Sequence, residues 1–133
     1  MSAEAEILRK YHKIAVVGLS GDEARESHGV AAYMQAAGYR IVPVNPAETE
    51  VLGEKAYPTV ASIPATGEIV NVFRRSEAVP GVVDDAIAAG AKVIWMQEGI
   101  VNKDAAAKAR AAGLEVVMDC CIRSEHRRMA ASV

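Results

Sequence analysis

One stretch of the chain, residues 13–37, constrains the fold more than any other. It opens with a β-branched apolar run at 14–17, which predicts a strand buried on both faces, and Gly18 ends that run. After a loop at 19–27, apolar residues recur with the spacing of one helix face: Val30, Tyr33, Met34 and Ala37. A strand, a glycine turn and a helix in this order leave unpaired amide groups and the positive end of a helix dipole at one edge of a sheet, where a phosphate can bind.

The same alternation continues along the chain. Further strands are predicted at 39–44, 68–73, 92–96 and 114–118, and further helices at 4–12, 76–90, 102–113 and 124–129. Ser76 and Asn102 are the expected N-caps, and Gly38 is the expected C-cap of the helix before it. The alternation predicts an α/β, Rossmann-like, doubly wound and mainly parallel five-stranded sheet with helices on both faces.

Two proline-containing segments interrupt this pattern. Pro43 lies in the second strand and cannot donate a ladder hydrogen bond, so we expect it near the strand end or where its nitrogen faces no partner. The segment 47–64 has no clear periodicity and is interpreted as an irregular crossover, with a helical turn near 59–63.

Composition and charge narrow the possible classes of protein. With 133 residues, about half of them apolar, the chain is predicted to form one domain, 1–133. A net charge of −2 lacks the basic footprint of a nucleic-acid-binding protein. The first residues resemble neither a secretion signal nor a membrane span, so we expect a cytoplasmic protein without a membrane partner. The adjacent Cys120 and Cys121 offer neither a disulfide framework nor zinc-ligand spacing, and no metal site is predicted.

The ends of the predicted strands supply the candidates for a ligand site. Ligands of open parallel sheets bind outside the carboxyl ends of the strands, near the point where the strand order reverses. A dinucleotide fingerprint would place three glycines where this chain has Gly18, Ser20 and Glu23, and an acidic residue near Asn45. A nicotinamide cofactor is therefore disfavoured.

Several blocks of sequence resemble a known family, in the right order and over nearly the whole chain. They are VVGLS at 16–20, the spacing of Arg25 and Ser27, PVNP at 43–46, LGE at 52–54, VFRRSE at 72–77, WMQ at 95–97, and VMD at 117–119 followed by Cys121. The chain resembles the small single-domain CoA-binding proteins, relatives of the CoA-binding domain of the succinyl-CoA synthetase α-subunit. The resemblance implies a Rossmann-like fold that binds coenzyme A or an acyl-CoA, and it implies no reaction.

The resemblance also assigns roles to residues. It implies phosphate binding by Gly18, Leu19 and Ser20, with Arg25 and one of Arg74 and Arg75 as cationic partners. The adenosine is expected against Asn45 and Pro46. The complete set of expected cofactor-binding residues is Gly18, Leu19, Ser20, Arg25, Ser27, Val44, Asn45, Pro46, Phe73, Arg74, Arg75, Gln97, Gly99 and Cys121.

Some of these residues have open alternatives. The turn from Gln97 to Gly99 either presents amide groups to the pantetheine end or serves only as a turn. Cys121 is either a reactive thiol beside the thiol of coenzyme A or a buried small residue. The resemblance also has departures, since this chain has Glu23 and Glu26 where the family often has prolines, and Cys120 where it has arginine.

Three functions fit the sequence. The first is a non-catalytic module that binds coenzyme A or an acyl-CoA, and no catalytic residue is expected in it. The second is a subunit of an acyl-CoA ligase or transferase whose partner chain supplies the nucleotide chemistry, because this chain is too short for a phosphohistidine or ATP-grasp domain. The third is a dinucleotide-binding redox sensor. A homodimer is a further possibility that the pattern leaves open.

Overall fold

The computed structural model describes residues 2–64 and 67–131. Five strands form the main sheet: β1 (Lys13–Val17), β2 (Arg40–Val44), β5 (Ile69–Val72), β6 (Val93–Met96) and β7 (Glu115–Val117). Five α-helices accompany them: α1 (Ala3–Lys10), α2 (Glu26–Ala36), α3 (Val79–Ala88), α4 (Lys103–Ala111) and α5 (Ile122–Ala131). Two short 3₁₀ helices, η1 (Val60–Ser62) and η2 (Ser76–Ala78), complete the crossovers.

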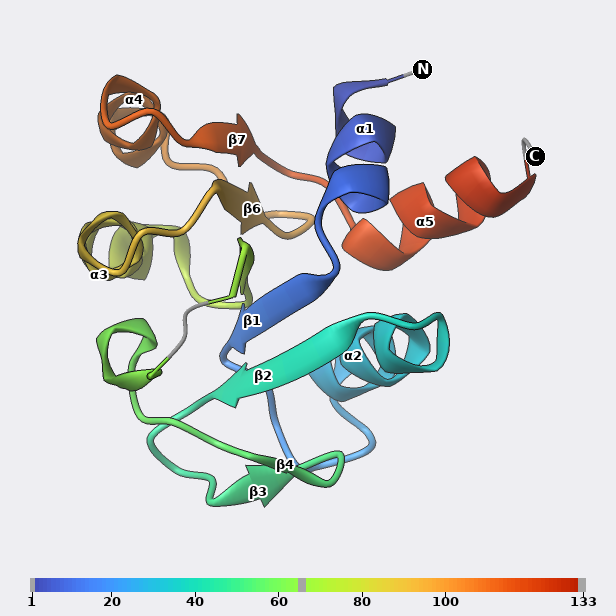
Figure 1. Cartoon of the computed structure of the whole chain (residues 1–133). Helices are drawn as coiled ribbons and strands as arrows, with labels where there is room; N and C mark the ends of the chain where they lie inside the picture. The colour runs from blue at the N-terminus through green and yellow to red at the C-terminus, as the bar shows by residue number, and fades with distance from the viewer. Residues whose placement is uncertain (1, 65–66, 132–133) are drawn as a thin grey trace.

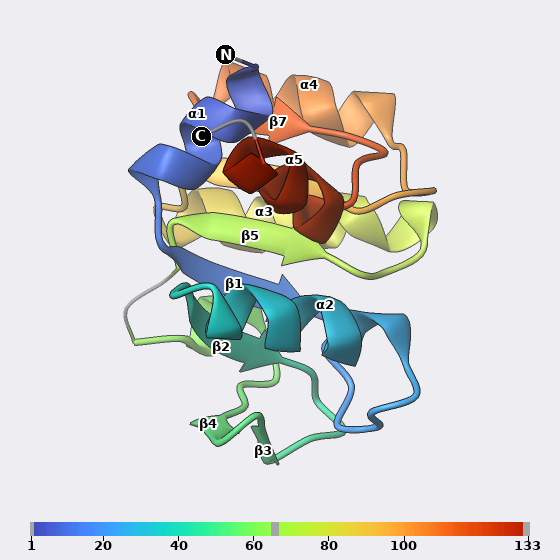
Figure 2. The same ribbon diagram turned by 90° about the vertical axis from the view of Figure 1, so that its right-hand side faces the viewer.

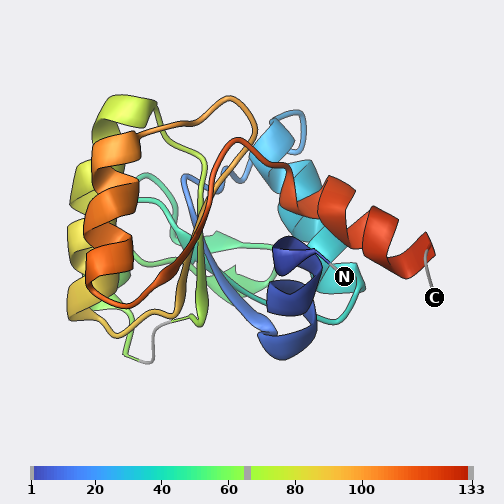
Figure 3. The same ribbon diagram turned by 90° about the horizontal axis from the view of Figure 1, so that it is seen from above.

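The main sheet is wholly parallel, with strand order β2-β1-β5-β6-β7. Helices α3 and α4 lie on one face, and α1, α2 and α5 lie on the other, as the view from above shows (Figures 1 and 3). Figure 2 looks onto the face that carries α1, α2 and α5. The predicted Rossmann-like, doubly wound fold is confirmed.

Each face of the sheet has its own hydrophobic core, because side chains alternate between the two faces along a strand. Beneath α3, α4 and η1, the strands contribute small apolar residues such as Ala15, Val42 and Val70. Beneath α1, α2 and α5, the core contains the fully buried Trp95, whose Nε1 donates a 2.8 Å hydrogen bond to the carbonyl of Cys120. Burial on both faces explains the near-continuous apolar runs of the central strands.

The predicted caps are confirmed at α4 but not at α3. The Asn102 side chain accepts a hydrogen bond from the amide of Ala105 and caps α4. Ser76 is not an N-cap. It is the first residue of η2, which precedes α3, and its Oγ accepts a 3.2 Å hydrogen bond from the amide of Val101. The hydroxyl therefore ties two loops together. Helices α2 and α5 begin slightly earlier than predicted, at Glu26 and Ile122.

The crossover after β2 contains a hairpin that the sequence did not predict. Strands β3 (Glu50–Val51) and β4 (Glu54–Lys55) pair antiparallel around Leu52 and Gly53, both with positive φ, at 55° and 77°. Two positive φ values are typical of a type I′ turn, which usually carries Asn-Gly or Asp-Gly. The predicted helical turn is confirmed as η1. Pro43 lies on β2, an edge strand of the main sheet, as its missing amide requires.

Candidate ligand site at the reversal of strand order

The strand order reverses between β1 and β5, and the residues that follow these strands approach each other closely there. The strand that follows β1 in the chain, β2, lies on one side of β1 in the sheet, and the next strand, β5, lies on its other side. The amide of Gly18 donates to the carbonyl of Val44, and the amide of Phe73 donates to the carbonyl of Val17, both at 2.8 Å. A β-carbon on residue 18 would overlap the Phe73 carbonyl oxygen, and φ is +90° there, so glycine is required.

The loop after Gly18 is held by its own polar groups. The amide of Ser20 donates to the Oγ of Ser27 at 3.1 Å, and the Ser20 hydroxyl accepts from the amide of Asp22 at 3.0 Å. His28 Nδ1 lies 2.9 Å from the carbonyl of Ser20, which can only accept, so Nδ1 carries the proton. Ser27 is 6% exposed, and its hydroxyl fixes the loop by accepting the hydrogen bond from Ser20.

Asn45 joins the end of β2 to this loop. Its Nδ2 donates a 3.1 Å hydrogen bond to the carbonyl of Leu19, while its Oδ1 accepts from the amide of Ala47. Leu19 is fully buried and does not line the cavity at these strand ends, so the sequence-based set placed it closer to a ligand than the structure does. Three chain segments are therefore fixed relative to one another before any ligand arrives.

A cavity of about 430 Å³ opens above these strand ends. It is lined by Gly18, Ser20, Arg25, Glu26, Ser27, Asn45, Phe73 and Arg74. All but Glu26 belong to the set that the sequence proposed for coenzyme A. The first turn of α2 borders the same space, and the amides of Glu26 and Ser27 donate no hydrogen bond to another described residue. The arrangement offers an anion both amide donors and guanidinium groups.

The cavity carries opposing charges. Arg25 and Arg74 form no ion pair with any residue that the structure describes. Glu26 is part of the lining, and Glu48 Oε2 accepts a 2.7 Å hydrogen bond from the amide of Gly21, just beside it. Glu48 was absent from the sequence-based set. Its carboxylate satisfies one loop amide, as a phosphate oxygen could.

Val44 and Pro46 border a second hollow of about 380 Å³, on the side of the sheet that carries α3. Pro58, Val60 and Val82 give it a mostly apolar wall, and Arg74 lines both hollows. Arg75 is exposed and borders a different hollow, together with Glu77. Of the two arginines proposed from the sequence, Arg74 is therefore the one that lines the main cavity.

Gln97, Gly99 and Cys121 do not line the main cavity. Gln97 is 2% exposed, and its Oε1 accepts from the Nδ2 of Asn71 and from the amide of Ile122. The amide of Gly99 donates to the Oδ1 of Asp119 at 2.7 Å and is thus already satisfied. Cys121 is buried at 9% exposure.

The neighbouring thiol of Cys120 is half-buried. Burial, followed by the nearby carboxylate of Glu125, raises the pKa of Cys120 from 9.0 to about 12. This thiol is therefore protonated at neutral pH, and it is a poor nucleophile because the thiolate is the reactive form.

Arg123 is a cation that the sequence-based set did not include and that packs near the site without lining the cavity. A β-carbon on Gly29, in the first turn of α2, would lie 3.5 Å from Arg123 Nη1, so the guanidinium packs against that turn. Its Nε is buried and has no hydrogen-bond partner among the described residues. Only the packing of α5 against α2 brings Arg123 there, and no periodicity within either helix encodes that packing.

The fold and the cavity define a doubly wound α/β domain with an anion-suited site at the reversal of its strand order. Residues 12–127 match the family model described as CoA binding domain, and the chain belongs to this family. Within residues 2–64 and 67–131, no group of three His, Cys, Asp or Glu side chains could hold a metal ion. Over the same residues, no helix has the length and apolar character needed to cross a membrane.

Comparison with known proteins agrees with this assignment. The chain is 47% identical over 121 residues to the uncharacterized protein YneT of Bacillus subtilis (strain 168), covering 91% of this chain and 90% of YneT. It superimposes with a TM-score of 0.92 on a hypothetical protein from Pyrococcus horikoshii OT3, at 42% identity, covering 96% of this chain and 89% of that one. It also resembles part of the dinucleotide-forming acetyl-coenzyme A synthetase 1 of Ca. Korarchaeum cryptofilum, with a TM-score of 0.74, 25% identity, and coverage of 86% of this chain and 27% of that one.

Proposed function

We propose that this chain is a single CoA-binding domain, residues 1–133, that binds coenzyme A or an acyl-CoA without catalysing a reaction. The observation that carries the proposal is the cavity at the ends of β1, β2 and β5, which brings together the glycine turn at Gly18, the unpaired amides in the first turn of α2, and the side chains of Arg25 and Arg74. Coenzyme A is a polyanion, and these are the groups that bind phosphate oxygens in proteins. Membership of the CoA binding domain family supports the choice of ligand.

The second hollow offers a binding surface for the adenine ring of the ligand. Pro46, Pro58 and Val82 form an accessible apolar wall that an adenine ring can cover, and Arg74 lines both this hollow and the main cavity. In the proposed arrangement the phosphates lie over the Gly18 turn and the adenosine lies against Pro46. The cysteines, Gln97 and Gly99 then have no required contact with the nucleotide.

Isothermal titration tests the proposal. Purified reduced protein is titrated with coenzyme A, acetyl-CoA, dephospho-CoA and NADH, and the titrations are repeated with Arg25→Ala and Arg74→Ala. Each substitution should weaken coenzyme A binding by about ten-fold or more, because each removes a charge-assisted hydrogen bond. Arg110→Ala, on the exposed surface of α4, is the matched control and should bind like the parent protein. Absence of saturable binding to coenzyme A and acetyl-CoA would overturn the proposal, and NADH binding that competes with coenzyme A would favour the redox-sensor alternative.

A substitution of Glu48 provides a test in which coenzyme A binding should become stronger instead of weaker. Its carboxylate lies beside the proposed phosphate position and repels a polyanion, while the hydrogen bond to Gly21 needs only an acceptor oxygen. Glu48→Gln should therefore strengthen coenzyme A binding by about two- to five-fold, the size expected for one partly exposed charge. Glu50→Gln, on β3, removes the same charge away from the cavity and should leave the affinity unchanged. Weaker binding by Glu48→Gln would show that the phosphates lie elsewhere.

The comparison with the acetyl-coenzyme A synthetase supports one second candidate. The region similar to this chain is 27% of that synthetase chain, so related domains also occur inside larger enzymes. In this alternative, the chain presents coenzyme A to a partner that performs nucleotide chemistry. Affinity purification of the tagged chain at its native level tests this candidate. A stoichiometric partner that forms acyl-CoA only in the presence of this chain would establish it, and monomer or homodimer alone would count against it.

A further inference from the structure

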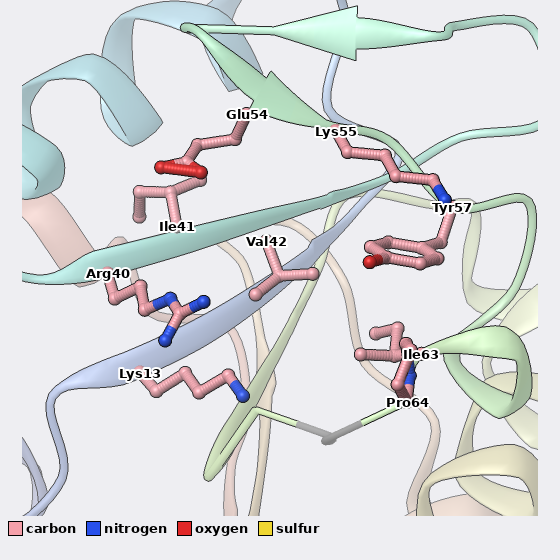
Figure 4. Close-up of a pocket in the computed structure, with 9 residues that line it drawn as sticks. All are labelled: Lys13, Arg40, Ile41, Val42, Glu54, Lys55, Tyr57, Ile63 and Pro64. Atoms are coloured by element: carbon pink, nitrogen blue, oxygen red, sulfur yellow. The ribbon is translucent and has the colours of Figure 1, made fainter.

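Another cavity, of about 270 Å³, lies at the opposite, amino-terminal edge of the main sheet, away from the reversal of strand order and from both hollows described above. Figure 4 shows the residues that line it: Lys13, Arg40, Ile41, Val42, Glu54, Lys55, Tyr57, Ile63 and Pro64. They come from the first residues of β1 and β2, from the hairpin strand β4, and from the segment around η1. None of them belongs to the proposed coenzyme A site.

The register of β1 and β2 places two cations side by side in this cavity. Lys13 and Arg40 are paired positions of the two parallel strands, so their side chains leave the same face of the sheet. Figure 4 shows the ends of both side chains turned to the space bordered by Val42 and Tyr57. Like charges at paired positions destabilise a sheet. An anion bound at Arg40 would reduce this repulsion.

The cavity has an excess of positive charge. Lys13, Arg40 and Lys55 face a single lining carboxylate, Glu54. Within the described part of the chain, Arg40 and Lys55 form no ion pair, although Lys55 Nζ stands 5.2 Å from the centre of the Tyr57 ring. The nearby Glu68 accepts a hydrogen bond from the amide of His12. A bound anion therefore has a guanidinium available to it.

The other wall of the cavity is apolar. Val42 and Ile63 lie at its base and are buried, at 7% and 8% exposure, and the exposed Pro64 and the partly exposed Tyr57 ring supply its accessible surface (Figure 4). A simple ion such as sulfate would leave this wall uncovered. The volume is slightly below the range of about 300–1,000 Å³ that is usual for drug-sized ligands, which favours a small occupant. The occupant that matches both walls is small, with one anionic end and one flat apolar end.

We infer that this cavity binds a small organic anion, a carboxylate or phosphate joined to a compact apolar or aromatic body. The anionic group lies beside the Arg40 guanidinium, and the apolar body covers Pro64 and the Tyr57 ring. The inference does not depend on the proposed function, because the two cavities lie at opposite edges of the sheet and share no lining residue.

Titrations followed by two-dimensional amide NMR test the inference. The probes are phenyl phosphate, benzoate, the uncharged analogue benzamide and inorganic phosphate. Phenyl phosphate or benzoate should give saturable shifts at Lys13, Arg40, Val42 and Tyr57, while benzamide and inorganic phosphate should bind these residues at least about ten-fold more weakly, because each lacks one of the two complementary parts. The tighter of phenyl phosphate and benzoate identifies the anionic group that the site prefers.

Arg40→Gln is the decisive variant, since Arg40 is exposed and its removal leaves the core intact. It should weaken the preferred probe by about ten-fold. Arg110→Gln removes the same charge from α4 and should have no effect. The inference is overturned if neither organic anion gives saturable shifts at this edge, if benzamide binds equally well, or if Arg40→Gln and Arg110→Gln behave alike. Shifts confined to Gly18 and Ser20 would also overturn it, because they would place the probe in the other cavity.

Discussion

At the scale of single residues, Gly18 is the position that the site tolerates least. Alanine there meets two costs, the strain of φ +90° and the overlap of its β-carbon with the Phe73 carbonyl. Gly113 has nearly the same φ, +91°, and open space around the added carbon. Gly113→Ala therefore reports the strain alone.

We predict that Gly18→Ala lowers the free energy of unfolding by about 1–3 kcal/mol more than Gly113→Ala does, the usual cost of overpacking. Urea unfolding of the two variants and the parent measures this difference. Gly18→Ala should also weaken coenzyme A binding, since the turn must move away from Phe73. Equal stability losses in both variants would mean that the two strand ends separate easily.

Cys120 gives a prediction about pH. Its thiol has a pKa raised from 9.0 to about 12, first by burial and then by Glu125. Between these two pH values the folded state keeps a proton that the unfolded chain loses, so the contribution of this group to stability is complete below pH 9 and is lost as the pH rises toward 12.

We therefore expect slow alkylation of Cys120. In Cys121→Ser protein, which retains Cys120 alone, iodoacetamide at pH 8.5 should react at least about ten-fold more slowly than with the same chain in urea. Adding Glu125→Gln should speed the reaction of the folded protein, because one cause of the raised pKa is removed. Equal rates in the folded and unfolded states would contradict the protonated, half-buried thiol.

At the scale of secondary-structure elements, Asn102 joins α4 to the turn that starts α3. Its Oδ1 caps α4 through the amide of Ala105, and its Nδ2 donates a 2.9 Å hydrogen bond to the carbonyl of Ser76. Asn102→Ala should cost about 1–2 kcal/mol of stability from the lost cap alone. Asn102→Asp keeps the cap and loses only the bond to Ser76, so its midpoint of thermal unfolding should lie between those of the parent and the alanine variant. An aspartate variant as unstable as alanine would assign the stability to the Ser76 contact instead.

The elements also show what the sequence could predict. The five strands and five helices follow from apolar periodicity, because both faces of the sheet are covered and every central strand is a near-continuous apolar run. The hairpin β3–β4 could not be predicted in this way, since its turn is Leu52-Gly53 and lacks the usual asparagine or aspartate. Two residues do not make a periodic pattern. Its position also depends on a contact distant in sequence, from Gln35 Nε2 to the carbonyl of Leu52.

The residues of the candidate site and its surroundings also fall into two groups, those that the sequence could predict and those that it could not. Residues directly after strands, such as Gly18, Asn45 and Arg74, could be predicted because parallel strands end at one edge. Arg123 and Glu48, which lie beside the cavity without lining it, could not be predicted, because tertiary packing alone brings them to the first turn of α2 and to the Gly21 amide. Gln97 follows β6 at the same edge, yet it is buried in a hydrogen-bond network with Asn71. Position at a strand end therefore predicts proximity to the edge but not exposure to a ligand.

At the scale of the whole molecule, the sheet separates two edges of different chemistry. The carboxyl edge carries the cavity of Gly18, Arg25 and Arg74, and the amino edge carries the cavity of Lys13 and Arg40. Strands β1 and β2 run between the two cavities with continuous pairing from Lys13–Arg40 to Val17–Val44. A ligand bound at one edge therefore contacts backbone amides that a ligand bound at the other edge does not contact.

Amide hydrogen exchange can show which edge coenzyme A occupies. Bound ligand shields the amides that it contacts and suppresses local opening of the segments that it joins, whereas added global stability slows only those amides that exchange through complete unfolding. Coenzyme A should therefore slow exchange most in residues 18–29, 45–47 and 73–76, which line or border the main cavity, while residues 11–13 and 38–40 at the amino edge exchange as before. Arg74→Ala should reduce this protection at equal ligand concentration, whereas Arg40→Gln should preserve it. Protection concentrated at residues 11–13 and 38–40 would place coenzyme A at the amino edge and would exchange the roles that we propose for the two cavities.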